Sequence, residues 1–331
     1  MHYNIGRFTA YPRKEKEALS MWNDFIVVAG SVLTLFLMMA VGFFLGKRSI
    51  LSPGTLGQIS TMLLYVVCPV IVVTSLMGES RDAATVRRLL ISAAALAGTY
   101  ILNMLLIQLC FRRTPAERRG VVRFAAIYGN TVFMGLPLIQ AALGAPGMLP
   151  VVVSMGIFNV CTWSHGAALI GGRERVSVRK AILNPGVISF AAALLLFATQ
   201  IRLPTPLTSA MGYLSNLNTP LAMVVIGAQM ASADLRSVFT DRSLYAVAAV
   251  KLLAVPLITM LVLLPFRLDP DTFTAIVILA ACPTAGSTSL FCQLMGKDTD
   301  LSARLISLTT LLSLVTLPLA ASAARAVSAL F

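Results

Sequence analysis

Two short stretches of the sequence combine helix-breaking residues with side chains that donate hydrogen bonds. Residues 129–137 read Gly-Asn-Thr-Val-Phe-Met-Gly-Leu-Pro, and residues 282–289 read Cys-Pro-Thr-Ala-Gly-Ser-Thr-Ser. The side-chain amide of Asn130 can donate two hydrogen bonds to a negatively charged group while carrying no charge itself. Further hydroxyl donors are available from Thr131, Thr284, Ser287, Thr288 and Ser289. The chemistry that these residues suggest is the binding of an anion.

Proline and glycine make an unbroken helix through either stretch unfavourable. Proline costs about 3 kcal/mol inside a helix because it lacks a backbone N–H and clashes with the preceding turn, and glycine adds roughly 1 kcal/mol. Gly135 and Gly286 are 151 residues apart, and so are Pro69 and Pro220. These two equal offsets indicate that the halves of the chain are related, with one broken helix in each half.

The rest of the sequence supplies apolar helices that can hold these stretches. Hydrophobic residues make up 57% of the 331 residues and charged residues only 12%, about half of the charged fraction of an average soluble domain. A membrane crossing needs roughly 20 consecutive apolar residues. The sequence therefore predicts an all-α polytopic membrane protein with ten spans. They are 25–46, 56–77, 89–111, 121–143, 148–170, 182–201, 207–231, 243–266, 272–295 and 303–326.

Basic residues set the expected orientation of these spans. The loops after the odd-numbered spans hold 15 Lys and Arg residues and those after the even-numbered spans hold five. Positively charged short loops stay in the cytoplasm, so both termini are expected outside it. The four basic residues of the N-terminal tail oppose this orientation, and translation from Met21 would remove the conflict. The net charge of +13 is thus a topology signal, and we expect no binding of nucleic acid.

The odd number of spans in each half has a topological consequence. If the halves share one fold, the second must be inverted relative to the first. We therefore expect a tail at 1–23, a first five-helix repeat at 24–171, a cytoplasmic linker at 172–181 and a second repeat at 182–331. Broken helices in mid-membrane survive only where they are buried in protein or line a cavity. One such break is more often a harmless kink, but the matched pair favours a binding site for an anion at the positive helix ends.

On these residues the chain resembles the auxin efflux carrier family, which includes the plant PIN auxin exporters and many bacterial permeases. Residues 130–138 look like the family's Asn-Thr-x-x-Met-Gly-x-Pro-Leu signature. The short linker between the halves is similar to that of the compact bacterial members. The resemblance implies two inverted five-helix repeats whose fourth and ninth helices cross at their breaks. It also implies an elevator-type carrier of an organic carboxylate, such as an auxin or a dicarboxylate like malate or malonate, assembled as a homodimer.

The resemblance also implies which residues bind substrate. Asn130 matches the position that faces the carboxylate, although it can equally cap the second half-helix. Ser154 stands near a position where relatives have Gln. Each hydroxyl by itself is more often bonded to a nearby backbone carbonyl than to a ligand. The predicted substrate-binding residues are Asn130, Thr131, Gly135, Pro137, Pro283, Thr284, Gly286, Ser287, Thr288, Ser154 and Pro69.

Lys251 is the one charged residue deep within a predicted span. A cation there is penalised by about 3 kcal/mol unless a partner or water compensates it. Three roles stay open: attracting the anion, taking the place of a coupling sodium ion, or donating to the carbonyl ends of the half-helices. Snorkelling to the interface is less favoured at this depth.

The remaining ionisable residues narrow the function classes. All thirteen Asp and Glu residues lie in loops or at span edges, which argues against a proton relay built on carboxylates. His165 is a candidate proton carrier, but a hydrogen-bonded core residue is the more common case. We expect no metal, no cofactor and no enzyme activity, because the five cysteines lack ligand spacing and no catalytic set occurs. The alternatives are a sodium-coupled symporter of the bile-acid type and a non-transporting membrane sensor, and the expected location is the cell (inner) membrane.

Overall fold

The computed structural model describes residues 13–172, 174, 176, 179, 182–232, 235–297 and 299–330, and the elements in this part are helices. The first half comprises α1 (Arg13–Lys47), α2 (Pro53–Met62), α3 (Cys68–Met77), α4 (Ala83–Cys110), α5 (Ala116–Ile127), α6 (Leu136–Leu143), α7 (Met148–Cys161) and α8 (Ala167–Gly171). The second half comprises α10 (Pro185–Thr199), α11 (Thr205–Asn216), α12 (Asn218–Ser232), α13 (Leu235–Thr240), α14 (Arg242–Ala249), α15 (Val255–Leu263), α16 (Pro270–Ala281), α17 (Ser287–Leu294) and α18 (Asp300–Ser328). The expectation of an all-helical protein is confirmed.

Six helical segments of the described residues are long and apolar enough to cross a membrane. They are Ile26–Lys47, Pro53–Met77, Ala83–Cys110, Ala145–Gly171, Arg242–Phe266 and Asp300–Ser328. Shorter apolar helices occupy Thr131–Leu143, Pro185–Thr199 and Pro270–Ala281. This is the composition of a multi-pass membrane protein.

The expected spans and the observed helices differ at particular places. The span expected at 207–231 is divided at Leu217 into α11 and α12, and the spans expected at 121–143 and 272–295 are interrupted. Helix α1 begins at Arg13, within the segment expected to be a tail. The expected linker 172–181 lies largely outside the described residues.

Three helices begin with the same local chemistry. Ser52, Asn184 and Asp269 each stand before a proline and accept a hydrogen bond from the backbone N–H three residues later. The side chain replaces one of the hydrogen bonds that a helix start lacks, while proline in the first turn loses no bond. These caps fix where α2, α10 and α16 start.

Four π-helical turns interrupt the spans, and three of them precede a proline. They are η1 (Leu63–Val67), η2 (Thr131–Gly135), η4 (Thr162–Gly166) and η6 (Val250–Ala254). Pro69, Pro137 and Pro256 follow η1, η2 and η6 by two residues. Widening the turn relieves the clash between the proline ring and the carbonyl four residues earlier. No proline follows η4 within its helix, so its widening has another cause.

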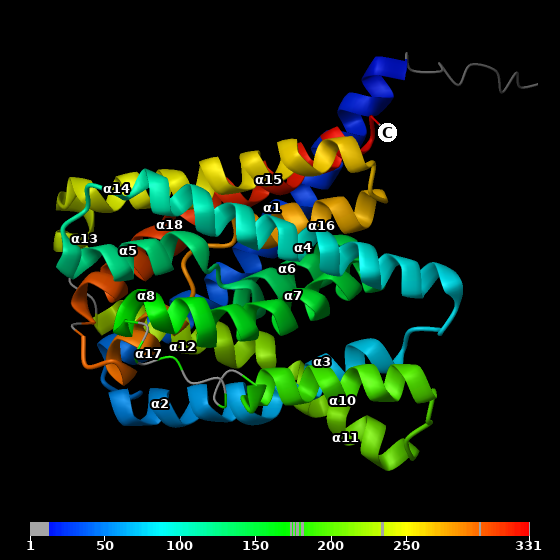
Figure 1. The fold of residues 1–331 in the computed structure, drawn as a ribbon, viewed down its shortest axis with the longest axis horizontal. Coiled ribbons are helices and arrows are strands. Elements are labelled where there is room, and N and C mark those ends of the chain that lie inside the picture. Colours follow the sequence, from blue (N-terminus) through cyan, green and yellow to red (C-terminus); the bar gives the residue numbers. More distant parts are fainter. Residues whose placement is uncertain are drawn as a thin grey trace, which may run out of the picture.

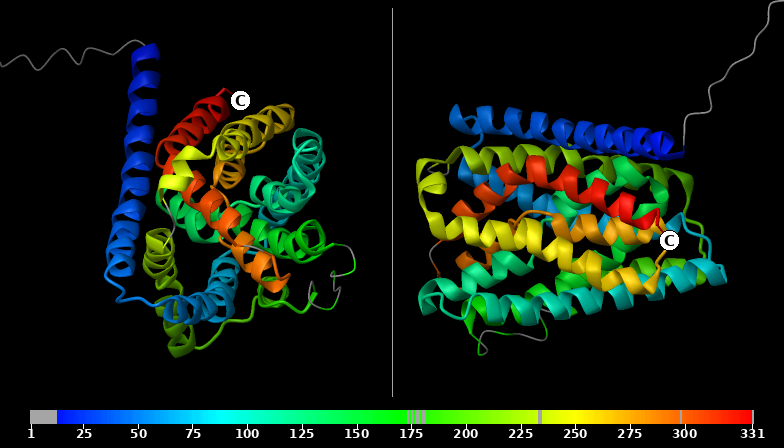
Figure 2. Two further views of the ribbon diagram at one scale, coloured as in Figure 1. Left: turned by 90° about the vertical axis from the view of Figure 1, so that its left-hand side faces the viewer. Right: turned by 90° about the horizontal axis from the view of Figure 1, so that it is seen from above.

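The helices pack side by side around two clusters of buried apolar residues. Figure 1 shows that the loop between α4 and α5, together with α13, lies at one end of the bundle, while the C-terminus lies at the other. Helix α1 runs along the outside of the bundle, where it packs against α12 and α18 (Figure 2). The interrupted segments between α5 and α6 and between α16 and α17 lie within this bundle.

Candidate functional site

The two interrupted helices meet at their breaks. Helix α5 ends at Ile127 and η2 begins at Thr131, while α16 ends at Ala281 and α17 begins at Ser287. The backbone N–H of Asn130 donates to the carbonyl of Pro283 at 2.7 Å, and the N–H of Ala285 donates to the carbonyl of Tyr128 at 3.0 Å. The result is an isolated antiparallel bridge between Gly129 and Thr284. The breaks thus satisfy part of each other's backbone, as freed groups inside an apolar bundle require.

At the first break, Asn130 is buried and caps the second half-helix. Its Oδ1 accepts a hydrogen bond from the backbone N–H of Phe133 at 3.3 Å. Within the described chain its Nδ2 donates to no residue, and the buried Oγ1 of Thr131 is also without a partner. Gly135 lies tight against the opposite helix, since a Cβ built on it would be 3.0 Å from Cys282 Sγ and 3.1 Å from Leu279 Cδ2. Pro137 lies just beyond, in the first turn of α6.

At the second break, most polar groups are bound within the protein. Thr284 donates its Oγ1 hydrogen to the carbonyl of Ala125 at 3.0 Å, and its N–H donates to Thr309 Oγ1 at 3.1 Å. Thr288 donates to the carbonyl of Ala285 at 2.8 Å. The Oγ of Ser287 is buried and has no partner among the described residues. A Cβ built on Gly286 would meet open space.

Lys251 lies beside the crossing and is 1% exposed. Its Nζ donates to the carbonyl of Ala280, near the end of α16, at 3.2 Å. A Cβ built on Gly129 would lie 3.0 Å from Nζ, so the glycine leaves the room that the lysine occupies. Of the three roles considered for Lys251, this contact corresponds to donation to a half-helix end.

Lys251 also lines a small cavity of about 20 Å³, which has room for one water molecule. Its polar lining includes Thr99, Tyr100, Asn103 and Ser154. Ser154 is fully buried, with Tyr100 beside it, and its Oγ makes no hydrogen bond of normal geometry to a described residue. The structure therefore places Ser154 in the same cavity lining as Lys251 and Gly129.

A larger cavity of about 840 Å³ lies between other helices. Its lining comes from η1, α3, η4, α8, α10, α11 and the end of α17, and it includes Tyr65, Trp163 and Met211. Of the predicted site residues, only Pro69 lines it. Next to Pro69, Cys68 Sγ approaches Asn218 Oδ1 at 4.0 Å, and Asn218 Nδ2 donates to the carbonyl of Val132 at 3.5 Å. This pair of contacts connects the cavity wall to the first break.

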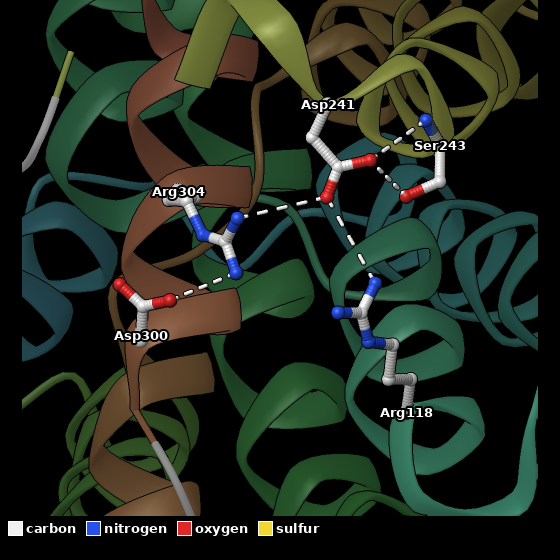
Figure 3. A network of polar contacts seen from close by, with 5 residues as sticks. All are labelled: Arg118, Asp241, Ser243, Asp300 and Arg304. Atoms are coloured by element: carbon white, nitrogen blue, oxygen red, sulfur yellow. Dashed lines mark hydrogen bonds and ion pairs between the residues drawn. The ribbon is translucent and has the colours of Figure 1, made fainter. Parts of the chain in front are cut away.

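An ion-pair network lies at the end of the bundle that carries α13 (Figure 3). Asp241 contacts Arg118 of α5 at 3.8 Å and Arg304 of α18 at 3.6 Å, and Arg304 also pairs with Asp300 at 2.8 Å. The hydrogen bond from the Ser243 hydroxyl, supported by the Ser243 N–H and the two arginines, holds the pKa of Asp241 below its ordinary value. The network joins the helix that leads into the first break with the helix that supports the second.

Three further residues that take part in the crossing lie outside the two stretches that the sequence singled out. They are Tyr128, whose carbonyl forms half of the backbone bridge, Asn218 and Thr309. Tyr128 adjoins the Gly129-Asn130 motif and Asn218 stands two residues before Pro220, so proximity to the breaks was an available signal. Thr309 lies inside a long helix with nothing in the sequence to mark it.

Comparison with known proteins agrees with this architecture. Residues 27–176 and 173–321 both match the model of a family described as "Membrane transport protein". The chain belongs to this family, the auxin efflux carrier family. The two matched segments each cover about half of the chain, which indicates an internal repeat.

Two relatives are similar over nearly their whole length. An uncharacterized transporter of Methanothermobacter thermautotrophicus is 23% identical over 293 residues, which cover 87% of this chain and 96% of the relative. The uncharacterized transporter YfdV of Escherichia coli (strain K12) is 22% identical over 313 residues, 90% of this chain and 98% of the relative. The protein is therefore a membrane transporter, and neither relative's name specifies a substrate.

Proposed function

We propose that the protein carries a small organic carboxylate, such as an auxin-like acid or a dicarboxylate, and binds it where the two broken helices meet. The observation that carries this proposal is the pair of second half-helices that start at the breaks, at Thr131 and Ser287. Their N-terminal ends carry positive partial charge, which favours an anion. The site thereby attracts a carboxylate without a formal charge of its own.

Unused hydrogen-bond donors support the same position. The hydroxyls of Thr131 and Ser287 are buried without a partner in the described residues. The side chain of Asn130 uses its Oδ1 as an acceptor, which leaves its Nδ2 available to a ligand. Buried polar groups are normally hydrogen-bonded, because an unsatisfied one costs about 1–3 kcal/mol. A bound carboxylate offers up to four acceptor positions to such donors. Asn130 then acts both as a cap, through Oδ1, and as a ligand, through Nδ2.

We also propose the full membrane architecture of the carrier. Ten crossings form two inverted five-helix repeats, at 24–171 and 182–331, and the short α10 and the α11–α12 pair supply the sixth and seventh crossings. The carrier works by elevator-type alternating access as a homodimer in the cell (inner) membrane, with both termini outside the cytoplasm. The two family matches and the gathering of the basic loop between α4 and α5 with α13 at one end of the bundle support this arrangement.

Lys251 favours a carrier that needs no sodium over a sodium-coupled symporter of the bile-acid type. Its Nζ occupies the carbonyl end of α16, where an alkali cation would otherwise find oxygen ligands. No carboxylate lines the small cavity among the described residues. In this proposal Lys251 is a tethered cation that takes the place of the coupling ion.

The test begins with binding. Purified protein is screened by thermal shift against indole-3-acetate, malonate and malate, since a ligand that binds only the folded state raises its apparent stability. Radiolabelled forms of any stabilising acid are then used for uptake into proteoliposomes with and without sodium. Saturable uptake that is independent of sodium and lost in Asn130→Ala supports the proposal. Sodium-dependent uptake favours the symporter, and binding without uptake favours a sensor.

A further inference from the structure

His165 makes a contact that the proposed binding site leaves unexplained. Its Nδ1 lies 2.9 Å from the hydroxyl of Tyr128, and the same hydroxyl lies 3.0 Å from the backbone carbonyl of Cys161. Tyr128 is fully buried and its own carbonyl forms half of the bridge between the two breaks. The Nε2 of His165 is buried and has no partner among the described residues.

The three groups allow one arrangement of hydrogens that satisfies both contacts. The carbonyl of Cys161 can only accept, so the single hydroxyl hydrogen of Tyr128 points to it. Nδ1 of His165 must then carry a hydrogen and donate it to the Tyr128 oxygen. A neutral imidazole with hydrogen on Nδ1 has a bare lone pair on Nε2. His165 is therefore held with an unused proton acceptor inside the protein.

The local helix geometry around His165 is also unusual. It lies in η4, the one π-helical turn of the described chain that no proline follows. Single π-turns inside α-helices occur frequently at functional sites. The aromatic ring of Tyr128 lies 6.3 Å from the imidazole between centroids, with the two planes tilted by 53°.

The groups around His165 bring no permanent charge. On α7 and α8, which flank and pack against η4, the one titratable side chain is Cys161. Tyr128 comes from the end of α5, and Tyr100 of α4 lies behind it at 6.3 Å between ring centroids. In the described part of the chain, no Asp, Glu, Lys or Arg side chain forms a hydrogen bond or an ion pair with His165. The crossing itself holds one cation, Lys251, whose Nζ lies beside Gly129, the residue that follows Tyr128.

The geometry points to His165 Nε2 as a proton-binding site that is connected through Tyr128 to the crossing of the two broken helices. Binding adds one proton to the Nε2 lone pair, and Nδ1–H remains on the Tyr128 oxygen. The bond to Tyr128 then becomes charge-assisted and stronger. Because the Tyr128 carbonyl accepts from Ala285 and Asn130 follows two residues later, protonation holds the first break more firmly against α7 and η4. The proton site itself does not depend on the proposed carrier function. Its consequence, the coupling of proton binding to anion binding, does rest on that function.

The sequence makes a direct test practical, since it contains two histidines, His2 and His165. The full-length His2→Gln protein, purified with a tag that contains no histidine and labelled with ¹⁵N-histidine, gives NMR signals from His165 alone. At alkaline pH we expect hydrogen on Nδ1 and a bare Nε2. On acidification through about pH 8 to 5, the range in which histidines commonly titrate, Nε2 should gain a proton while Nδ1 keeps its own.

Tyr128→Phe is the matched variant for the connection. It removes the oxygen that fixes Nδ1–H, so the tautomer preference at alkaline pH should disappear while the imidazole stays in place. The inference is overturned if His165 carries its hydrogen on Nε2 at alkaline pH in the protein that retains Tyr128. It is equally overturned if His165 fails to titrate over this range. It is also overturned if Tyr128→Phe leaves the tautomer unchanged.

A second measurement tests the coupling with an acid that the binding screen has identified among indole-3-acetate, malonate and malate. Coupling between two sites typically changes affinity about 5- to 150-fold. We therefore expect the half-saturating concentration for uptake to change at least about fivefold between pH 5.5 and 8. In His165→Asn, whose amide can still donate to Tyr128 but cannot titrate, the change should be below about twofold.

An equal pH effect in both proteins overturns the coupling. The NMR result does not depend on any substrate, so a titrating His165 in a protein that carries none of these acids would refute the proposed function and leave the proton site intact.

Discussion

The two breaks share a glycine at equivalent positions, Gly135 and Gly286, but use their polar groups differently. At the second break, Thr284 and Thr288 direct their hydroxyls to backbone carbonyls, and Thr309 of α18 receives the Thr284 N–H. At the first break, Asn130 uses one side-chain atom as a cap, and its other atom and the hydroxyl of Thr131 have no partner in the described chain. Groups that are already satisfied gain little from a ligand, whereas unsatisfied donors gain a full hydrogen bond.

The glycines show the same asymmetry in packing. Gly135 lies against Cys282 and Leu279, while the equivalent position at the other break, Gly286, faces open space. The first break therefore needs a small residue for helix contact, and the second leaves room near Ser287. We infer that the first break supplies most of the binding groups and that the second mainly holds it in position.

The largest expected effect is on ligand binding. Asn130→Ala should weaken binding and uptake about 10- to 150-fold, because a hydrogen bond to a charged group contributes about 1.5–3 kcal/mol. The matched change at the second break, Thr284→Val, should leave the affinity within about threefold. Thermal-shift titration with the stabilising acid measures both. If Thr284→Val weakens binding as much as Asn130→Ala, the assignment of binding to the first break is wrong.

The paired glycines give the next largest effect, on stability. Gly135→Ala should lower the free energy of unfolding by about 1–3 kcal/mol, the usual cost of overpacking a close helix contact. Gly286→Ala should change it by less than about 0.5 kcal/mol, since its Cβ meets no atom within 4 Å. Equilibrium unfolding in detergent compares the two. Similar losses of unfolding free energy in both variants would show that the two breaks do not differ in packing.

Removing a hydroxyl group at the second break should have a somewhat smaller effect on the free energy of unfolding. Thr284→Val removes the hydroxyl that donates to the buried carbonyl of Ala125, so we expect a loss of about 1–2 kcal/mol in the free energy of unfolding. Ser287→Ala removes a buried hydroxyl that has no partner in the described residues and should not lower the free energy of unfolding. A larger loss in Ser287→Ala than in Thr284→Val would contradict the supporting role of the second break.

The smallest effect concerns Asp241, which joins the helices of both breaks. Asp241→Asn keeps an N-cap but removes the charge facing Arg118 and Arg304, and such partly exposed pairs contribute about 0–1 kcal/mol. Because the folded-state pKa of Asp241 is depressed, its contribution is fully present above about pH 3.9, the ordinary value. The contribution disappears as the pH falls through the lower folded-state pKa.

The free energy of unfolding of Asp241→Asn and of the parent protein is measured from pH 7 downward, at low and at high salt. The difference between the two proteins should become smaller as the pH falls and as the salt concentration rises. A difference that persists at low pH would show that the charge of Asp241 is not what connects these helices.

The sequence predicted the positions of the two breaks better than it predicted the surroundings of individual residues. Pro283 and the Gly129-Asn130 motif predicted interruptions at the right places, because a missing N–H and a missing Cβ act locally in any fold. Ser154 lines the small cavity together with Lys251, a neighbour that the sequence did not predict for it. Its position depends on how α7 packs against its neighbours, which no local pattern encodes.

What the sequence by itself determined is the apolar helices, their caps and the two interruptions, since each follows from residues within a few turns of one another. What only the tertiary structure decided is the partnership across the chain: Asn130 with Pro283, Tyr128 with His165, and Lys251 with the end of α16. The physical reason is that a buried polar group takes whichever partner the packing brings within about 3 Å. Sequence separation does not enter that choice.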